Sequence, residues 1–343
     1  MRAVILAGGE GTRLRPLTSR VAKPVVTLVD RPFIVYMLDW LRRHGVEDIL
    51  LCCGFGAGGV RSVLGDGSRY GVRLAYVEEQ EPLGTAGPLA LAREQLETEP
   101  RFVVCNGDVL TDIDLGAQIE AHERSGATAT LALVEVEDPS AYGLVRTAGD
   151  GAVLEFLEKP QPGESSEGEG NWISAGAYVL EREMLELIEP GRAISIEREI
   201  WPKLVGNGLY GYQAHGYWLD IGTPARYLQG SFDILTATVE VGGPAPARVP
   251  ASCAIAADAR IGELVVLGEG VRVGAGATIE RSVVLAGAQI GAGSRLKDSI
   301  VAERAKIGAN VELEEDVVVG EDAQIADGSR LGAGTRVGPG ESL

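Results

Sequence analysis

The sequence predicts two domains, an α/β domain followed by a parallel β-helix, and three observations support this fold class. Up to about residue 240, apolar runs typical of buried strands alternate with segments of helical periodicity, which indicates a layered fold with a largely parallel central sheet. Beyond about residue 250, aliphatic residues recur every six positions. Between these patterns, 242–246 reads Gly-Gly-Pro-Ala-Pro, a linker composition. We therefore expect domains over 1–240 and 251–343 and a linker over 241–250.

The elements of the first domain follow from hydrophobic periodicity. Strands are expected at 2–7, 48–53, 73–78, 102–106 and 153–157, and helices at 32–43, 85–96 and 115–123. Because parallel strands of such folds end at one edge of the sheet, residues that follow the strands are expected to gather there. The sequence therefore predicts a binding site at the carboxyl ends of these strands.

The second domain is predicted from the six-residue repeat. Its aliphatic positions, with two steps of five residues, are Ile255, Ile261, Leu267, Val273, Ile279, Val284, Ile290, Leu296, Val301, Ile307, Leu313, Val319, Ile325, Leu331, Val337 and Leu343. Glycine follows many of them. The pattern resembles the hexapeptide repeat of left-handed parallel β-helices, in which each hexapeptide forms one side of a triangular coil. We expect stacked coils around a continuous aliphatic column, with two register slips.

The composition excludes several classes of protein. The chain has 343 residues, 45% of them hydrophobic, and a formal net charge of -18, so it can bury a core but should repel a nucleic-acid backbone. No apolar run approaches the length of a membrane span, and the N-terminus begins a strand rather than a signal peptide. We expect a cytoplasmic protein that binds neither nucleic acid nor membrane. Its four cysteines lie in apolar contexts and are expected to be buried thiols.

The segment after the first strand has the features of a phosphate-binding loop. Behind the apolar run 3–7, the glycines and cations are Gly8, Gly9, Gly11, Arg13, Arg15 and Lys23. Glycines let backbone N–H groups approach an anion, and an arginine can hold two phosphate oxygens at once. The spacing matches neither Gly-x4-Gly-Lys-Ser/Thr nor Gly-x-Gly-x-x-Gly. The loop is therefore of another type.

Several motifs in order along the chain resemble those of the sugar-1-phosphate nucleotidyltransferases. They are Gly8-Gly9-Glu10-Gly11-Thr12-Arg13-Leu14-Arg15-Pro16-Leu17-Thr18 with Lys23-Pro24, Leu83-Gly84-Thr85-Ala86-Gly87, Asn106-Gly107-Asp108, Tyr142-Gly143, Glu158-Lys159-Pro160 and Trp218-Leu219-Asp220-Ile221-Gly222-Thr223-Pro224. The chain departs from the family pattern at Ser174, where Asn is usual before Ala-Gly, and at Ala22, where Pro commonly precedes Lys-Pro. The first departure bears on which sugar is bound.

The resemblance implies a Rossmann-like nucleotidyltransferase sandwich with a mixed, mostly parallel sheet, and a reaction of NTP with sugar 1-phosphate that yields NDP-sugar and pyrophosphate. It implies Mg²⁺ as cofactor, with Asp108 and Asp220 as metal ligands, and catalytic roles for Arg13, Lys23, Asp108 and Asp220. The implied nucleotide-binding residues are Ala7, Gly8, Gly9, Gly11, Thr12, Arg13, Glu79, Gly84, Thr85 and Asp108. The implied sugar-phosphate residues are Tyr142, Gly143, Glu158, Lys159, Ser174 and Glu197. By sequence, Asp112 and Asp114 are nearer candidates for the metal, although Asp114 fits the N-cap of the helix beginning at Leu115.

Within the family, the segment Ser195-Ile196-Glu197 favours the mannose-1-phosphate guanylyltransferases. In related enzymes the residue five before the glycine of Leu-Gly-Thr reads the base, which gives that role to Glu79, or to Gln80 if the register shifts by one. A carboxylate can accept both the N1–H and the N2 amino group of guanine. The alternatives are a glucose-1-phosphate uridylyl- or thymidylyltransferase and, in a different class, a non-catalytic regulatory paralogue that binds nucleotide sugar. A glycosyltransferase could hold metal at Asp112-Ile113-Asp114, but the glycine loop and Lys23 would then be unexplained.

The repeat domain raises a further hypothesis, since many proteins with hexapeptide repeats transfer acyl groups with a histidine as general base. The histidines are His44, His122 and His215, and none lies beyond the linker. We therefore interpret the β-helix as an assembly or regulatory module and expect a homo-oligomer.

Overall fold

The structure is a computed structural model that describes residues 1–161, 170–243 and 247–343. Three residues of the expected linker, 244–246, lie outside the described residues. The chain divides into two compact units. One unit holds residues 1–9 and 37–218, and the other holds 10–36 and 219–343. The division means that the segment after Gly9 belongs to the same unit as the β-helix.

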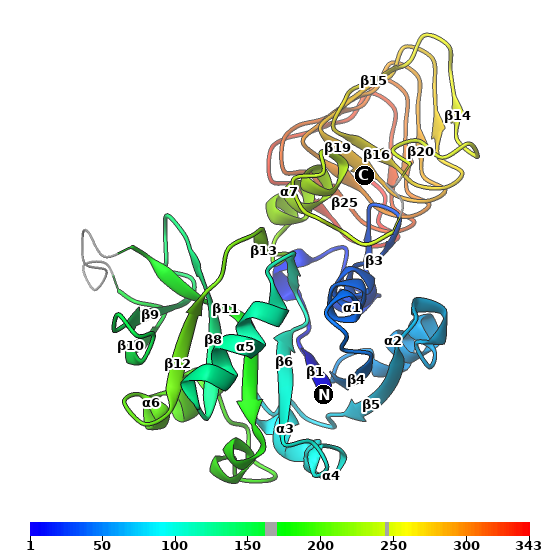
Figure 1. The fold of residues 1–343 in the computed structure, drawn as a ribbon. Coiled ribbons are helices and arrows are strands. Elements are labelled where there is room, and N and C mark those ends of the chain that lie inside the picture. The colour runs from blue at the N-terminus through cyan, green and yellow to red at the C-terminus, as the bar shows by residue number, and fades with distance from the viewer. Residues whose placement is uncertain (162–169, 244–246) are drawn as a thin grey trace. The chain divides into compact units, whose positions relative to one another are not determined.

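The first unit is built on a mixed β-sheet (Figure 1), nine-stranded as far as the structure describes the chain. In its parallel half the strand order is β6-β1-β4-β5, with β1 at Arg2–Ala7, β4 at Asp48–Cys53, β5 at Arg73–Glu78 and β6 at Arg101–Asn106. These strands confirm four of the predicted segments, and only β6 begins one residue earlier than expected. In β1, β4 and β6 consecutive buried aliphatic residues explain the agreement, since both faces of these strands are covered, whereas the edge strand β5 buries only Val77.

The other half of this sheet is arranged around β11 (Trp172–Glu181), which runs antiparallel to β6, β8 and β9. The remaining strands are β8 (Ala129–Glu135), β9 (Gly143–Thr147), β10 (Val153–Glu158) and β12 (Leu209–Gln213). Strand β12 pairs in parallel with β8. The predicted strand at 153–157 is confirmed by β10. The sheet is therefore mixed, as the resemblance implied.

The helices confirm two of the three predicted helical segments. They are α1 (Phe33–Arg43), α2 (Ala57–Leu64), α3 (Gly87–Leu91), α4 (Arg93–Leu96), α5 (Leu115–Ser125), α6 (Trp201–Leu204) and α7 (Pro224–Leu235). The single helix predicted at 85–96 is wrong, because helical structure begins only at Gly87 and is interrupted at Ala92. The two residues before Gly87 instead bond to the distant 194–196 segment. Their tertiary hydrogen bonds thus override the local helical pattern.

One apolar cluster in the core of the first unit includes side chains of β1, β4, β6, β8 and β11. Its largest members include Tyr178 on β11 and Trp201 on α6, whose rings meet edge to face with centroids 5.2 Å apart. An aromatic pair of this geometry adds to the stabilisation from burial alone. The packing holds β11 against α6.

The second unit contains the repeat domain, which forms a triangular parallel β-helix (Figure 1) and confirms the predicted left-handed β-helix architecture. Its three sheets are β14-β17-β20-β23-β26, β15-β18-β21-β24-β27 and β16-β19-β22-β25-β28. The strands are Ala254–Ile255, Arg260–Ile261, Val265–Leu267, Arg272–Val273, Thr278–Glu280, Ser282–Val284, Gln289–Ile290, Arg295–Lys297, Ile300–Val301, Lys306–Ile307, Glu312–Leu313, Val318–Val319, Gln324–Ile325, Arg330–Leu331 and Arg336–Val337. The aliphatic residue of each repeat from Leu267 to Val337 is buried in one column.

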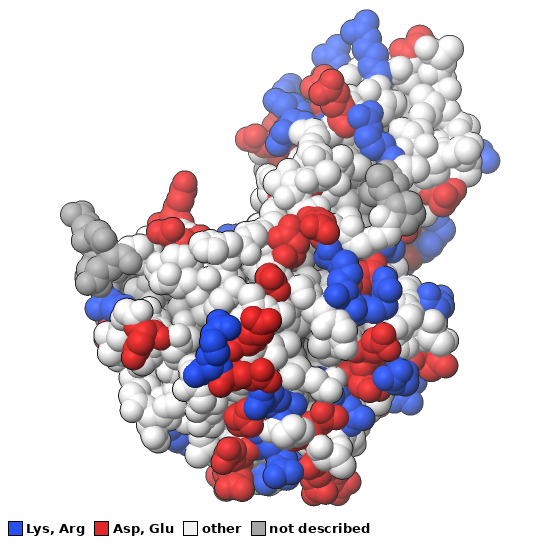
Figure 2. Space-filling model, in the orientation of Figure 1, with Lys and Arg blue, Asp and Glu red and all other residues white. Residues whose placement is uncertain are grey.

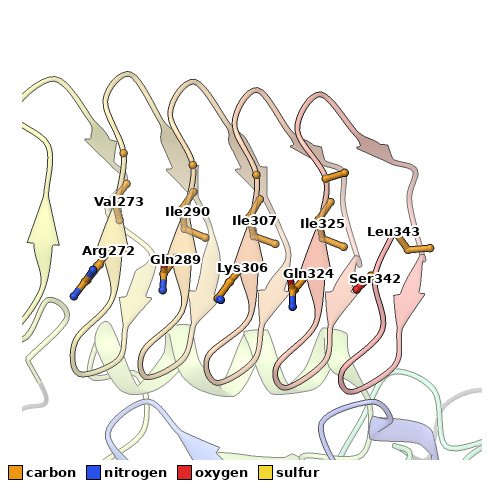
Figure 3. Close-up of a pocket in the computed structure, with 14 residues that line it drawn as sticks. Arg272, Val273, Gln289, Ile290, Lys306, Ile307, Gln324, Ile325, Ser342 and Leu343 are labelled. Carbon is orange, nitrogen blue, oxygen red and sulfur yellow. The ribbon is translucent and has the colours of Figure 1, made fainter.

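Figure 3 shows one side of this column, where Val273, Ile290, Ile307 and Ile325 stack inside the coils. The preceding residues, Arg272, Gln289, Lys306 and Gln324, point to the outside and line a shallow groove of about 490 Å³. Alternate residues of a strand face opposite sides, so one register places every aliphatic side chain in the column.

The two predicted register slips are confirmed and lie at shortened corners of the β-helix. Arg281 and Asp298 occupy these corners with left-handed backbone, at φ 45° and 44°. The Arg281 Nε donates to Asp298 Oδ1 at 2.7 Å, so the ion pair joins successive coils at the slip. Each of these corners is one residue shorter than the others. The aliphatic residues that face inward still stack on those of the next coil, because the strands on either side of the corner keep their pairing.

The segment 10–36 packs within the second unit. It holds the short strands β2 (Thr27–Leu28) and β3 (Arg31–Pro32). The Tyr227 hydroxyl of α7 donates to the Thr27 carbonyl at 2.6 Å, and Arg20 pairs with Asp322 of the β-helix at 3.3 Å. The phosphate-loop cations that follow Gly9 are therefore carried by a segment anchored to α7 and the β-helix.

Charged side chains of both signs are interspersed over the described part of the face drawn in Figure 2. This face is therefore not one continuous acidic surface, although the formal net charge of the chain is -18. Among the described residues, no helix combines the length and apolar character needed to cross a membrane.

The aliphatic column generates a stability prediction. We expect Ile307→Ala to destabilise the β-helix by about 2–5 kcal/mol, because the substitution leaves a cavity among side chains that cannot close around it. The matched control is Lys306→Ala, which changes the exposed neighbour on the same strand and should alter stability by no more than about 0.5 kcal/mol. Chemical denaturation followed by circular dichroism measures both. Equal effects of the two variants would contradict the inward assignment.

Candidate active site

The loop after β1 lies against backbone from two neighbouring strands. A Cβ on Gly54 would stand 2.8 Å from the Gly8 carbonyl oxygen, and a Cβ on Gly107 would stand 2.7 Å from the Leu6 carbonyl oxygen. Gly107 also donates its N–H to that Leu6 oxygen at 2.8 Å. Ala7, the last residue of β1, is buried. The close approach therefore requires glycine beside the end of β1, where the sequence predicts nucleotide binding.

Glu79 lies directly beside the first glycine of this loop. Its Oε1 is 2.4 Å from the point where a Cβ on Gly8 would stand, and its Oε2 accepts the Leu83 N–H at 3.1 Å. Burial raises the pKa of the Glu79 carboxyl above its usual range. The expected base-reading side chain is thus held at the loop and is partly desolvated, whereas Glu81 is exposed.

The cations of the loop belong to the second unit. Gly11 has left-handed backbone at φ 62°, and a Cβ there would stand 3.1 Å from both Lys23 Cβ and Thr18 Cγ2. The Thr18 hydroxyl donates to the Gly11 carbonyl at 2.7 Å. Arg13 lies on a 3₁₀ turn over Thr12–Leu14, and Lys23 begins another at Lys23–Val25. The turn at Gly11 therefore holds the stem of Lys23 against the loop.

Asp220 lies near Arg13 within the same unit. The Arg13 Nη2 and the Asp220 Oδ2 are 2.9 and 3.2 Å from the point where a Cβ on Gly222 would stand. Arg226, in the first turn of α7, pairs with the other oxygen of Asp220. The sequence analysis did not single out Arg226. The sequence feature that could have identified Arg226 is its position three residues after the N-cap Thr223. Residues three apart lie on the same face of a helix, so the Arg226 side chain lies near the start of α7.

Asp108 follows β6 at the edge where the parallel strands end, and it is half-buried. The nearby Asp112 and Asp114 serve the fold. The Asp112 Oδ1 accepts the Tyr217 N–H at 2.6 Å, and Asp114 is confirmed as the N-cap of α5, where it accepts the Ala117 N–H at 3.0 Å. One carboxylate oxygen of each of these two aspartates is thus used in a structural hydrogen bond.

Among the expected sugar-phosphate residues, the charge of Glu197 influences the ionisation of Glu158. Burial, and next the charge of Glu197, raise the pKa of the Glu158 carboxyl above its usual range. Lys159 has left-handed backbone at φ 54° and its Nζ is 3.8 Å from Glu158 Oε1. Glu158 ends β10 and Glu197 lies almost 40 residues later, so the fold brings them together.

Tyr142, Gly143 and Ser174 are also found in this unit. The Tyr142 ring meets Trp218 edge to face at 5.4 Å, and Ser174 lies on β11 near Tyr178. A Cβ on Gly143 would stand 2.4 Å from the Phe156 ring. The missing side chain at Gly143 therefore makes room for Phe156, a packing reason that the sequence did not reveal.

The Gly84-Thr85 pair is bonded to the segment that carries Glu197. Gly84 has φ 72° and a Cβ there would stand 2.5 Å from the Ile194 carbonyl oxygen. The Thr85 hydroxyl donates to Glu197 Oε2 at 2.6 Å, and the Ser195 hydroxyl donates to the same oxygen at 2.8 Å. The structure thus joins a residue expected to bind nucleotide to one expected to bind sugar.

Other reactive side chains have structural surroundings. His122 is buried between Thr130 and Glu181, at 2.8 and 3.1 Å. All four cysteines are free thiols, and three of them are buried, namely Cys52, Cys53 and Cys105. Burial raises the pKa of Cys105 to about 12, so this thiol is not a nucleophile at neutral pH.

Comparison with known families gives two matches. The family described as "Nucleotidyl transferase" matches residues 2–237, and the one described as "GMPPB C-terminal domain" matches residues 245–339. The first covers more than half of the chain. Together they span the α/β pattern and the hexapeptide repeats.

Curated relatives and solved structures agree with these matches. The chain is 35% identical over 296 residues to mannose-1-phosphate guanylyltransferase of Mycobacterium tuberculosis, covering 83% of this chain and 80% of the relative. It is 33% identical over 344 residues to the probable mannose-1-phosphate guanylyltransferase 1 of Oryza sativa subsp. japonica, covering 95% and 93%. A putative glucose-1-phosphate thymidylyltransferase from Bacillus anthracis shares the fold with a TM-score of 0.62 at 24% identity, covering 71% of this chain and 97% of that one.

The pairing of Glu158 with Glu197 generates a prediction about ionisation. We expect Glu197→Gln to lower the pKa of Glu158, because the removal of a nearby negative charge makes ionisation of the remaining carboxyl easier. Carbon-13 NMR titration of the glutamate carboxyl signals measures the shift. The control is Glu155→Gln on the same strand, whose partner is Arg146, and it should leave the Glu158 titration unchanged. A Glu158 pKa that stays the same in Glu197→Gln would disprove the coupling.

Proposed function

The chain belongs to the nucleotidyl transferase family, and from this premise we propose that it transfers a guanylyl group from GTP to mannose 1-phosphate, yielding GDP-mannose and pyrophosphate. The substrate pair is the one named for relatives that align with 83% and 95% of the chain. The observation that carries the choice of base is the carboxylate of Glu79 beside Gly8.

Glu79 suits guanine better than a pyrimidine. Guanine presents two adjacent donors, N1–H and the N2 amino group, and a carboxylate accepts both. Uracil and thymine present one donor between two acceptors, so the carboxylate oxygens would face the carbonyl oxygens of the base and be repelled by them. Because the Leu83 N–H accounts for one hydrogen bond to Oε2, the Glu79 side chain is oriented before any base arrives.

The chemistry requires positioning and neutralisation of charge rather than a dedicated base. A phosphate oxygen of mannose 1-phosphate attacks the α-phosphorus of GTP in line, the bond from that phosphorus to the bridging oxygen breaks, and pyrophosphate leaves. The attacking phosphomonoester has a second pKa of about 6 and is already largely ionised at neutral pH. Arg13 and Lys23 bind the triphosphate and stabilise the charge that moves onto pyrophosphate.

The residues present fit a magnesium requirement. Among the described residues, no group of three or more His, Cys, Asp or Glu side chains could hold a metal, so the chain offers no cage made of protein alone. Mg²⁺ in nucleotide sites is held by one or two carboxylates together with substrate phosphates, and Asp108 and Asp220 would serve as those ligands. The ion would neutralise charge on the triphosphate.

The sugar phosphate is proposed to bind at Glu158, Lys159 and Glu197. Lys159 carries the cation that a phosphate needs, and the two carboxylates accept hydrogen bonds from sugar hydroxyls. Both carboxylates are partly buried, which strengthens such bonds once water is excluded. The regulatory, non-catalytic alternative is disfavoured because Arg13, Lys23, Asp108 and Asp220 are all present.

A screen of pyrophosphate release tests this function. Each NTP is combined with a panel of sugar 1-phosphates, and we expect GTP with mannose 1-phosphate to give the highest kcat/KM. Chelation with EDTA should abolish release and added Mg²⁺ should restore it. A preference for UTP or dTTP with glucose 1-phosphate would instead indicate a glucose-1-phosphate uridylyl- or thymidylyltransferase. No pyrophosphate release with any pair would favour the regulatory paralogue.

Replacement of Glu79 tests how the base is chosen. We expect Glu79→Gln to lower kcat/KM for GTP by a factor equivalent to about 1–3 kcal/mol of transition-state binding, the usual cost of losing a hydrogen bond to a charged group. The activity with UTP or dTTP relative to GTP should rise. The control is Glu81→Gln, an exposed carboxylate two residues along, which should keep the nucleotide ranking. If Glu79→Gln preserves the ranking as well, another group reads the base.

A further inference from the structure

The hydroxyl of Thr85 uses its only proton and one acceptor site in hydrogen bonds inside the protein. It donates its single proton to Glu197 Oε2 at 2.6 Å and accepts the Ile196 N–H at 2.8 Å. A hydroxyl has one proton to give, so Thr85 cannot donate to a nucleotide without releasing Glu197. Its side chain therefore serves the 195–197 segment, although the motif around it is of the nucleotide-binding type.

The backbone of the same loop is paired with that segment. The Ile194 N–H donates to the Leu83 carbonyl and the Ala86 N–H donates to the Ile194 carbonyl, both at 2.9 Å. Gly84 permits this contact, because any Cβ there would strike the Ile194 backbone. The 83–86 loop and the 194–197 segment are thus one hydrogen-bonded structure, although more than 100 residues separate them in sequence.

The other end of the loop is bonded to Glu79. The Leu83 N–H donates to Glu79 Oε2, so a continuous path runs from Glu79 through Leu83 and Ile194 to Thr85 and Glu197. At the far end, Glu197 Oε2 receives both the Thr85 and the Ser195 hydroxyl protons. Among the described residues Oε1 of Glu197 accepts no hydrogen bond, which leaves that oxygen available to a ligand.

We propose that Thr85 is a positioning residue that fixes Glu197 for a hydroxyl of the sugar 1-phosphate and couples it to the nucleotide loop. This inference rests on the proposed function. Two hydroxyl donors on Oε2 hold the carboxylate in one orientation, so less side-chain freedom is lost when the sugar binds.

The test compares Thr85→Val with Thr85→Ser. The valine keeps the shape but removes the hydroxyl, and it should raise KM for mannose 1-phosphate about tenfold to a hundredfold while KM for GTP changes less than about threefold. The serine restores the hydroxyl and should restore the KM for the sugar phosphate. Thr130→Val is the matched control, since it removes another buried hydroxyl of the same unit, bonded to His122, and should affect neither KM.

A double-mutant cycle shows whether Thr85 acts through Glu197. If it does, Thr85→Val should have little further effect on the KM for mannose 1-phosphate in a Glu197→Gln background. Fully additive effects, or a Thr85→Val variant that loses GTP affinity as strongly as sugar-phosphate affinity, would overturn the proposal.

The result is separable from the proposed function, because the wild-type protein is assayed first. If it turns over GTP with mannose 1-phosphate and Thr85→Val matches it, the positioning role is refuted and the function stands. If the screen selects another sugar 1-phosphate, the assignment of GTP and mannose 1-phosphate as substrates fails. The same variants are then measured with the NTP and sugar 1-phosphate that the screen selects. If no pair is turned over, the proposed function fails, and calorimetric titration of mannose 1-phosphate with a non-hydrolysable GTP analogue then tests the positioning role by itself. Weaker binding to Thr85→Val than to wild type would support that role, and equal binding or no binding to either would refute it.

Discussion

Close backbone approach at the end of β1 is the constraint on which the candidate site depends. Gly54 and Gly107 lie so near to the Gly8 and Leu6 carbonyls that no side chain fits at either position, and Gly84 has the same relation to Ile194. Glycine is required because a Cβ would push the neighbouring strands apart. The loops that follow β1, β4 and β6 can therefore gather at one sheet edge.

The charged residues proposed to bind substrate differ in sign between the two units. The carboxylates Glu79, Glu158 and Glu197 belong to the first unit and suit the hydrogen-bond donors of a base and a sugar. Arg13 and Lys23 belong to the second unit and suit phosphates. Under the proposed function, an acidic protein would bind anionic substrates because a few fixed cations and a divalent ion act locally.

Much of the fold was predictable because hydrophobic period is a local property. Strands β1, β4 and β5 have the predicted bounds, and the six-residue repeat gave the β-helix with both register slips at Arg281 and Asp298. The prediction of a single helix at 85–96 was wrong because its first residues are held by contacts that are not local. Thr85 and Ala86 have helical periodicity, but their hydrogen bonds go to a segment more than 100 residues away.

The sequence by itself determined the α/β pattern, the hexapeptide repeat, the glycine loop and the motifs that carry the family resemblance. Only the tertiary structure decided that Thr85 holds Glu197, that Glu158 lies near Glu197 and that Gly143 makes room for Phe156. The physical reason is that patterns of period two, 3.6 and six record which face of an element is buried. A hydrogen bond between distant loops has no period, so its partners become known only when the chain is folded.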